Sequence, residues 1–402
     1  MATRAAEHPM LRGLTPKETG VLGILVGCFA FLLALPPISV RAAWLPILIG
    51  LVAIAAGIWA VTSGVKRIGW FAVTAGILGT VLGVLATNTA AGKLDSVVSW
   101  TPLFTAMFSF ATPLTFAAIG GMFSERSGVV NIGLEGMMLT GAFFAVLGAD
   151  KLGNWTLGLL CAVIAGGVAA LIHAFVSIHL RADQIVSGTA INFLALGVTG
   201  YFFIQVYGDN GTPGSISQVP NVNIPGLDRL GFIGPVFGHL NLMIWLMFLT
   251  LIVSYIVVFR TPIGLRLRSV GEHPRAADTV GISVYKVRYA AVILSGMLSA
   301  LGGAYLSIGF LGSFNENMTA GRGFIGLAAL IFGNWRPFGA FAAALLFGFS
   351  TALSFRLADP AVWPSQAVLF QALPYVLTLI AVAGVIGRSI PPAASGRPYR
   401  KQ

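Results

Sequence analysis

The feature that most limits the fold of this chain is a set of long segments without charged side chains. Five of them exceed the roughly 20 residues that a helix needs to cross a bilayer: Ile68–Gly92, Gln184–Gly208, Leu230–Phe259, Tyr289–Asn315 and Pro360–Gly387. Charged residues make up 9% of the chain, whereas a soluble domain is about a quarter charged. In hydrocarbon only helices and closed barrels satisfy their backbone groups, and these segments lack the alternation of barrel strands. The sequence therefore predicts an all-α, polytopic transmembrane helical bundle of about 10–12 spans.

The candidate spans are distributed along the whole chain. They are Val21–Leu35, Trp44–Val61, Ile68–Ala86, Pro102–Gly121, Val129–Gly148, Trp155–Ile178, Ile185–Tyr207, Asn241–Phe259, Tyr289–Phe310, Gly323–Gly333, Phe338–Phe355 and Ala367–Ile386. The segment Gly323–Gly333 is too short to cross comfortably. We expect it to be a half-helix or part of a re-entrant segment.

Positive charge is distributed unevenly between the two sides that these spans define. If the N-terminus is cytoplasmic and every span crosses, 18 of the 24 Lys and Arg residues lie in cytoplasmic segments. The others are Arg41, Lys93, Lys151, Arg229, Arg322 and Arg356. Because cytoplasmic loops are enriched in Lys and Arg, we expect both termini in the cytoplasm and the chain in the plasma (inner, cytoplasmic) membrane. This bias accounts for the net charge of +11 without a nucleic-acid partner.

The chain is expected to have three regions. Residues 1–95 hold few polar groups and are expected to form an accessory bundle of about three transmembrane helices. Residues 96–390 are expected to form the permeation core, and residues 391–402 a basic cytoplasmic tail. In the first region the spacings Gly23-x-x-x-Gly27 and Gly79-x-x-x-Gly83 either permit close helix approach or are ordinary glycines of membrane helices. Cys28 and Cys161 lie in apolar runs and predict neither a disulfide framework nor a metal site.

The first polar segment inside the core is "ERSGVVNIGLEGMML", residues 125–139. Asn131 and Glu135 are four residues apart, so on one helix they would share a face. An intramembrane carboxylate is a candidate functional group, and both residues are candidates for lining a solute path, with a structural role as the open alternative. For Glu125 and Arg126 the favoured interpretation is that they lie near the interface and satisfy each other, together with water and the helix dipole.

A second polar segment contains Asn315, Glu316 and Asn317. It echoes the first, with Phe314-Asn315-Glu316 against Phe123-Ser124-Glu125 and Gly326-Leu327 against Gly133-Leu134. Glycine-interrupted polar segments of opposite orientation are typical of inverted repeats around a midplane site. We therefore hypothesise an inverted repeat and a path for a polar solute lined by Asn131, Glu135, Asn192, Asn315, Glu316 and Asn317. Single polar residues within spans, Asn192 among them, more often join helices than bind ligands.

The segment between Arg260 and Arg288 is the longest expected cytoplasmic loop and carries several basic residues. Pro274 suits the first turn of a helix, and the following residues predict a short helix that ends near Gly281. Such a helix suits the docking of a cytoplasmic partner. The alternative is an ordinary loop whose arginines only fix the topology.

Four motifs in combination resemble a known family. They are "ERSGVVNIGLEGMMLTGAF", "GLRLRSVGEHPRAADTVGISVYKVR", "ILSGMLSALGGAYLSIG" and "NENMTAGRGFIGLAALIFGNWRPFGA". Over about Thr101–Gly387 the chain resembles permease subunits of ABC importers for nucleosides and simple sugars, in particular the second of two paired permeases. The three N-terminal spans depart from the family pattern, and the resemblance does not explain them.

The resemblance implies a set of partners and a docking site. The coupling helix that docks on a separate ATPase would include Gly271, Glu272, Pro274, Arg275, Ala276, Ala277 and Gly281. Further partners would be a second permease, forming a heterodimer, and an extracytoplasmic substrate-binding lipoprotein. The chain itself has no phosphate-binding loop, zincin motif or nucleophile elbow. We therefore expect no catalysis and no cofactor in this chain, with ATP and Mg²⁺ bound by the partner ATPase.

Several functions remain as alternatives. The favoured cargo is a nucleoside, with purine nucleosides first, because amides and the aromatic rings of Phe123, Phe314 and Phe324 suit an uncharged ribose and a flat base. The same architecture would also serve ribose, galactose or branched-chain amino acids. A proton-coupled transporter that titrates Glu135 or Glu316 would leave the docking loop unexplained, and a membrane scaffold would leave the buried polar groups unexplained.

Overall fold

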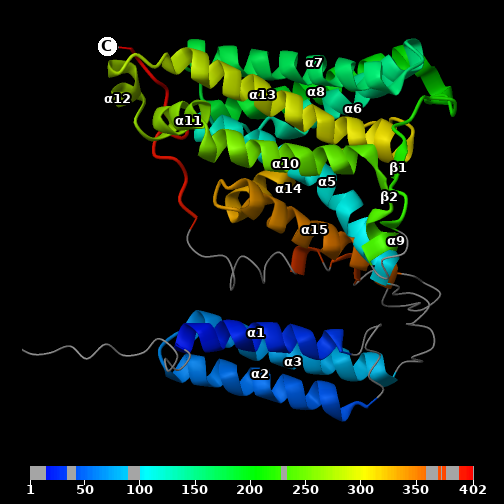
Figure 1. The fold of residues 1–402 in the computed structure, drawn as a ribbon, viewed down its shortest axis with the longest axis vertical. Coiled ribbons are helices and arrows are strands. Elements are labelled where there is room, and N and C mark those ends of the chain that lie inside the picture. The colour runs from blue at the N-terminus through cyan, green and yellow to red at the C-terminus, as the bar shows by residue number, and fades with distance from the viewer. Residues whose placement is uncertain are drawn as a thin grey trace, which may run out of the picture. The chain divides into compact units, whose positions relative to one another are not determined.

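The computed structural model describes residues 15–33, 42–88, 100–227, 233–358, 370–372, 374–376 and 389–401 (Figure 1). The chain divides into two compact units. Unit 1 comprises Met1–Leu103 and Leu353–Gly387, and unit 2 comprises Phe104–Ala352 and Arg388–Gln402. In the described part of both units the secondary structure is almost entirely helical, which confirms the predicted fold class.

Unit 1 contains a bundle of three helices, α1 (Pro16–Leu32), α2 (Trp44–Thr62) and α3 (Lys66–Asn88). Thr15 and Glu18 form a capping box at the start of α1. Glycines bring α1 and α3 together: a Cβ on Gly79 would overlap the carbonyl oxygen of Gly27, and one on Gly27 would lie 2.6 Å from the backbone of Ala75. Of the two alternatives for these glycines, the structure therefore shows close helix approach.

Unit 2 contains most of the long helices. They are α5 (Trp100–Arg126), α6 (Leu134–Lys151), α7 (Trp155–Ala174), α8 (Gln184–Tyr207), α10 (Leu242–Arg260), α13 (Val284–Ala304) and α15 (Pro337–Leu357). Two of them continue as π-helices, α7 into η2 (Phe175–His179) and α13 into η5 (Tyr305–Leu311). A shorter helix, α14 (Arg322–Phe332), precedes α15.

Eight of the described helices are long and apolar enough to cross a membrane. This confirms a multi-pass membrane protein, although the predicted last span, Ala367–Ile386, lies largely outside the described residues. The predicted span Val129–Gly148 is wrong at its start, because α6 begins only at Leu134 and a loop precedes it. The predicted half-helix at Gly323–Gly333 is confirmed as α14, whose 11 residues give a length of about 16 Å.

Short elements gather at the two ends of unit 2 (Figure 1). At one end lie η3 (Gly208–Asn210), α9 (Ile233–Phe237) and a two-stranded antiparallel sheet of β1 (Asn221–Asn223) and β2 (His239–Asn241). At the other end lie α11 (Pro262–Glu272), α12 (Pro274–Thr279) and the C-terminal residues 389–401. We call these the sheet end and the docking end.

Small residues also set the packing inside unit 2. A Cβ on Gly303 of α13 would overlap the backbone of Met138 in α6, and one on Gly141 would overlap Ala300. Gly166 of α7 meets Gly296 of α13 in the same way. Because of these contacts α6, α7 and α13 pack closely against one another.

Candidate functional site

Within the first polar segment, residues 127–133 form a loop that is largely buried between α5 and α6. Gly128 adopts φ +90° just after α5 ends, a conformation typical of a helix C-terminus. Side chains from other helices bind the loop backbone: Gln184 Oε1 accepts from the N–H of Val130 (2.7 Å), and Asn192 Nδ2 donates to Ile132 O (3.1 Å). His173 Nε2 lies 3.1 Å from Val130 O. Irregular backbone within a membrane protein needs such partners, so Asn192 and His173 act here as joints between helices.

Asn131 lies in this loop, so the prediction that it shares a helix face with Glu135 is wrong. Its side chain is fully buried, and Nδ2 donates to Ser295 Oγ of α13 at 3.0 Å. Its Oδ1 atom is buried without a hydrogen-bond partner in the described structure. The amide thus fixes the loop to α13.

Glu135 occupies the first turn of α6 and reaches the start of α14. Its Oε1 atom accepts from Thr319 Oγ1 at 2.6 Å and from the N–H of Gly321 at 2.8 Å, and its Oε2 atom accepts from the N–H of Gly323 at 2.6 Å. A carboxylate at a helix N-terminus satisfies free N–H groups and faces the positive end of the helix dipole. Glu135 therefore caps α14.

Two glycines make this junction possible. A Cβ on Gly323 would lie 2.5 Å from the Cα and N atoms of Glu135, so α14 could not approach with a larger residue there. A Cβ on Gly136 would lie 2.7 Å from Ile191 O, where α6 crosses α8. At that crossing Asn192 Oδ1 accepts from the N–H of Gly136 at 2.7 Å, which caps α6 in turn.

The far end of α14 is fixed to the end of α5 through Trp335. Arg126 donates to Trp335 O through Nε (3.0 Å) and Nη2 (2.9 Å), and Trp335 Nε1 donates to Glu125 Oε2 (2.6 Å). The prediction that Glu125 and Arg126 satisfy each other is therefore wrong, since in the described structure both bind Trp335. The half-helix is held at both of its ends.

Asn315, Glu316 and Asn317 lie in the turns between η5 and α14 and are exposed. Asn317 adopts φ 54°, and the N–H of Met318 bonds to Asn315 O at 3.1 Å. The structure thus separates the predicted path residues. Three of them bind groups of the protein itself: Asn131, Glu135 and Asn192. The side chains of residues 315–317 are exposed in this chain.

The residue-by-residue echo between the two polar segments is wrong. Gly133 is the N-cap of α6, but its expected counterpart Gly326 lies inside α14, whose N-cap is Gly321. Glu125 lies within α5, whereas Glu316 follows the end of η5. What the two segments share is a coarser order: a long, buried helix is followed by a loop and then by a second helix. Glu135 lies in the first turn of the second helix in one segment, α6, and binds the N-terminus of the second helix in the other, α14.

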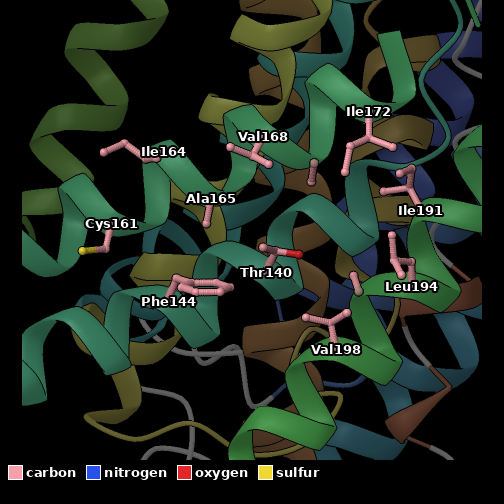
Figure 2. A pocket seen from close by; sticks show the side chains of 12 residues that line it. Thr140, Phe144, Cys161, Ile164, Ala165, Val168, Ile172, Ile191, Leu194 and Val198 are labelled. Carbon is pink, nitrogen blue, oxygen red and sulfur yellow. The ribbon is translucent and has the colours of Figure 1, made fainter. Parts of the chain in front are cut away.

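A cavity of about 460 Å³ lies between α6, α7 and α8 (Figure 2). Its lining is almost wholly apolar, and it includes Phe144, Ile164, Val168 and Leu194. The hydroxyl of Thr140, also in the lining, is bound to Gly136 O at 2.8 Å. The cavity therefore suits hydrocarbon rather than a polar solute, and it contains no predicted path residue.

The short helix predicted after Pro274 is present as α12, with Pro274 in its first turn and Gly281 at φ +84° beyond its end. Ala277 is buried, whereas Glu272, Arg275 and Ala276 are exposed. Gly271 packs directly on the carbonyl of Arg126, which places the end of α11, just before α12, against the end of α5.

Sequence reasoning missed α11, which precedes this helix. Its signal was present, since Thr261 Oγ1 accepts from the N–H of Gly264 and Pro262 occupies the first turn. It also missed Thr319 and Trp335 as partners of the acidic residues, and nothing local in the sequence indicates these long-range contacts.

The described structure is thus a multi-pass helical bundle with a capped short helix, α14, and a short, largely exposed helix, α12, at one end. Residues 103–382 match the family described as branched-chain amino acid transport system / permease component, and the chain belongs to this family. The matched range begins beyond α1, α2 and α3.

Known relatives cover most of the chain. It is 44% identical over 317 residues to the guanosine ABC transporter permease protein NupQ of Bacillus subtilis, covering 77% of this chain and 99% of NupQ. It is 42% identical over 303 residues to the nucleoside ABC transporter permease protein NupC of Lactococcus lactis, covering 73% and 95% of the two chains. A putative glucose ABC transporter permease protein, TsgC13 of Haloferax volcanii, is 36% identical over 258 residues, covering 63% and 77%. Lower similarity extends to a second permease from each of the first two organisms, NupP and NupB.

Proposed function

We propose that this chain is the transmembrane permease subunit of an ATP-binding cassette importer for nucleosides, with purine nucleosides as the favoured cargo. The observation that carries the proposal is the identity of 44% and 42% over nearly the full length of two permeases named for guanosine and nucleoside transport. The chain is a transport subunit rather than an enzyme, and ATP hydrolysis belongs to a partner ATPase. ATP and Mg²⁺ would bind that partner, and no cofactor is assigned to this chain.

The proposed complex contains three partners. Similarity to both NupQ and NupP of one organism supports a pair of related permeases, and hence a heterodimer. The exposed Glu272, Arg275 and Ala276 of the docking end support an ATPase seated on α12. A substrate-binding lipoprotein would deliver solute to the sheet end.

The proposed path runs along the exposed turn that precedes α14. Asn315, Glu316 and Asn317 are the groups of this chain that a solute would meet, and the second permease would supply the opposite wall. Behind this surface, Asn131 would hold the loop 127–133 to α13, Asn192 would hold α6 to α8, and Glu135 would hold α6 to α14.

The proposed orientation puts the docking end in the cytoplasm, within the inner membrane. Exposed basic residues gather there on α11, α12 and the C-terminal segment, namely Arg266, Arg275, Arg397, Arg400 and Lys401. This distribution agrees with the enrichment of Lys and Arg in cytoplasmic segments. The N-terminus would lie on the same side.

A sugar is the second candidate cargo, because the putative glucose permease TsgC13 is also a relative. Proton coupling through Glu135 is less well supported. Its carboxylate accepts from three donors, and protonation would turn an acceptor oxygen into a donor that opposes them.

The proposal is tested by isolating the tagged chain from its membrane in mild detergent and identifying the proteins that accompany it. We expect a P-loop ATPase and a second permease, and we expect the double variant Glu272→Ala, Arg275→Ala to lose the ATPase but keep the permease. Lys151→Ala is the matched control, since Lys151 is an exposed basic residue on the last turn of α6. Recovery of the chain alone, from membranes that still import nucleosides without ATP, would overturn the proposal.

A further inference from the structure

The C-terminal residues 389–401 return to the docking end and bind it through their backbone. The N–H of Ile390 donates to Asn334 Oδ1 at 3.0 Å, and the N–H of Ala394 donates to Gly271 O at 2.9 Å. The N–H of Ala393 donates to Glu272 Oε2 at 3.2 Å. This segment, which we call the C-terminal strap, is therefore an ordered part of unit 2 and not a free basic tail.

Tyr399 anchors the strap in the small hydrophobic core beneath α12. Its side chain is 6% exposed and packs with Val270, Ala277 and Val284. Its ring lies 5.6 Å from that of Tyr285 in an edge-to-face contact. Burial, together with the nearby carboxylate of Asp278 in α12, raises the pKa of the Tyr399 hydroxyl. The hydroxyl is therefore a proton donor at neutral pH.

Arg288 connects the strap to the buried loop 127–133. This arginine of α13 is 1% exposed; its Nη1 donates to Arg397 O (3.1 Å) and its Nε to Ser127 O (3.2 Å). A Cβ on Gly128 would lie 2.8 Å from Arg288 Nη2 and 3.2 Å from Ala394 O. The strap is therefore packed between α12 and the loop that leads into α6.

The strap also adds positive charge beside α12. Arg397, Arg400 and Lys401 are exposed, and Arg275 of α12 is close enough to act electrostatically on Tyr399. Val280, just beyond α12, is 74% exposed and presents an apolar side chain next to these cations. A complementary partner surface would have an apolar pocket with carboxylates at its rim.

We infer that the C-terminal strap is part of the ATPase docking surface: it braces α12 through Tyr399 and presents Arg397 and Arg400 to an acidic rim on the ATPase. The inference rests on the proposed function, because it takes the ATPase as the partner of α12. It extends that function by assigning a binding role to residues outside the matched family range of 103–382.

The test uses the complete complex in lipid nanodiscs, with a photo-reactive residue placed in turn at Arg400, Arg275 and Lys151. We expect cross-links to the ATPase from Arg400 and Arg275 and none from Lys151. We also expect Arg397→Glu, Arg400→Glu to weaken retention of the ATPase by about tenfold, with an effect that shrinks at high salt. Both side chains are exposed, so this variant leaves the core beneath α12 intact.

Tyr399 provides a second measurement. Tyr399→Phe keeps the ring in the core and should retain most ATPase binding, whereas Tyr399→Ala should lose it while still recovering the second permease. Cross-linking from Arg275 but not Arg400, together with full ATPase retention by the Glu double variant, would overturn the strap's role and leave the proposed function standing. Absence of ATPase cross-links from both positions would overturn the proposed function as well.

Discussion

The carboxylate of Glu135 in α6 accepts a hydrogen bond of 2.6 Å from the backbone N–H of Gly323 in α14. Through this bond the first turns of two helices that are 188 residues apart in sequence meet at one side chain. A helix that starts inside a protein has free N–H groups at its first turn, and these need acceptors. Glu135 meets that requirement, and most of the predictions below depend on this junction.

Replacing Glu135 should destabilise the protein more than replacing an exposed acid. Glu135→Ala leaves three donors without their acceptor, and we expect a loss of about 3 kcal/mol or more, with Glu135→Gln losing about 1–3 kcal/mol. The measurement is the thermal unfolding midpoint in nanodiscs. Glu316→Gln, at an exposed position of the following turn, is the control and should change stability by less than about 0.5 kcal/mol. Equal midpoints for the two positions would contradict the capping role.

Gly323→Ala should disrupt the same junction by steric overlap. The added Cβ would lie 2.5 Å from the Glu135 backbone, and overpacking of this kind costs about 1–3 kcal/mol or more. Gly197→Ala in α8 is the matched control, because a Cβ there meets nothing within 4 Å and alanine favours a helix over glycine by about 0.5–1 kcal/mol. We expect unfolding midpoints that move in opposite directions, and a shared direction would refute the close packing at Gly323.

Asn192 should act on stability rather than on solute recognition. Asn192→Leu leaves the N–H of Gly136 and the carbonyl of Ile132 without their partner, which we expect to cost about 1–3 kcal/mol. Thr189→Ala on the same helix is the control, since the Thr189 hydroxyl bonds within α8 to Ile185 O. If Asn192→Leu kept its unfolding midpoint but raised the KM for nucleoside uptake, Asn192 would belong to the path and not to the scaffold.

Substitutions in the exposed turn before α14 should change nucleoside uptake and leave stability nearly unchanged. Asn315→Ala and Asn317→Gly remove amides that are uncovered in this chain, and glycine accommodates the positive φ of Asn317. We expect unfolding midpoints within about 0.5 kcal/mol of the parent and a KM for nucleoside uptake that is raised severalfold. Unchanged uptake in both variants would exclude this turn from the solute path.

The helical framework could be predicted from the sequence because charge-free runs of bilayer length leave few alternatives. The short helix α12 was also predictable, since Pro274 and Gly281 mark its ends locally. The loop 127–133 was not: Val129 and Val130 extend the apolar pattern of α6, and only Gly128 and Gly133 hint at a break. The loop persists because Gln184, Asn192 and His173 bind its backbone, and these residues come from elements far along the chain.

The sequence singled out unusual residues more successfully than it predicted what those residues do. Glu135 was identified as an unusual intramembrane acid, but its partners Thr319 and Gly323 lie in a segment that no local pattern connects to α6. The C-terminal segment read as a basic tail from its composition. Its contact with α12 depends on Tyr399, a single aromatic residue whose burial becomes visible only in three dimensions.

The most direct test of the proposed function is uptake of guanosine into proteoliposomes that contain this chain, its sister permease and the ATPase, with the binding lipoprotein outside and ATP inside. We expect uptake that requires ATP and the lipoprotein, and that falls to background in the double variant Glu272→Ala, Arg275→Ala. Uptake that continues without ATP and collapses when the proton gradient is removed would contradict an ABC importer.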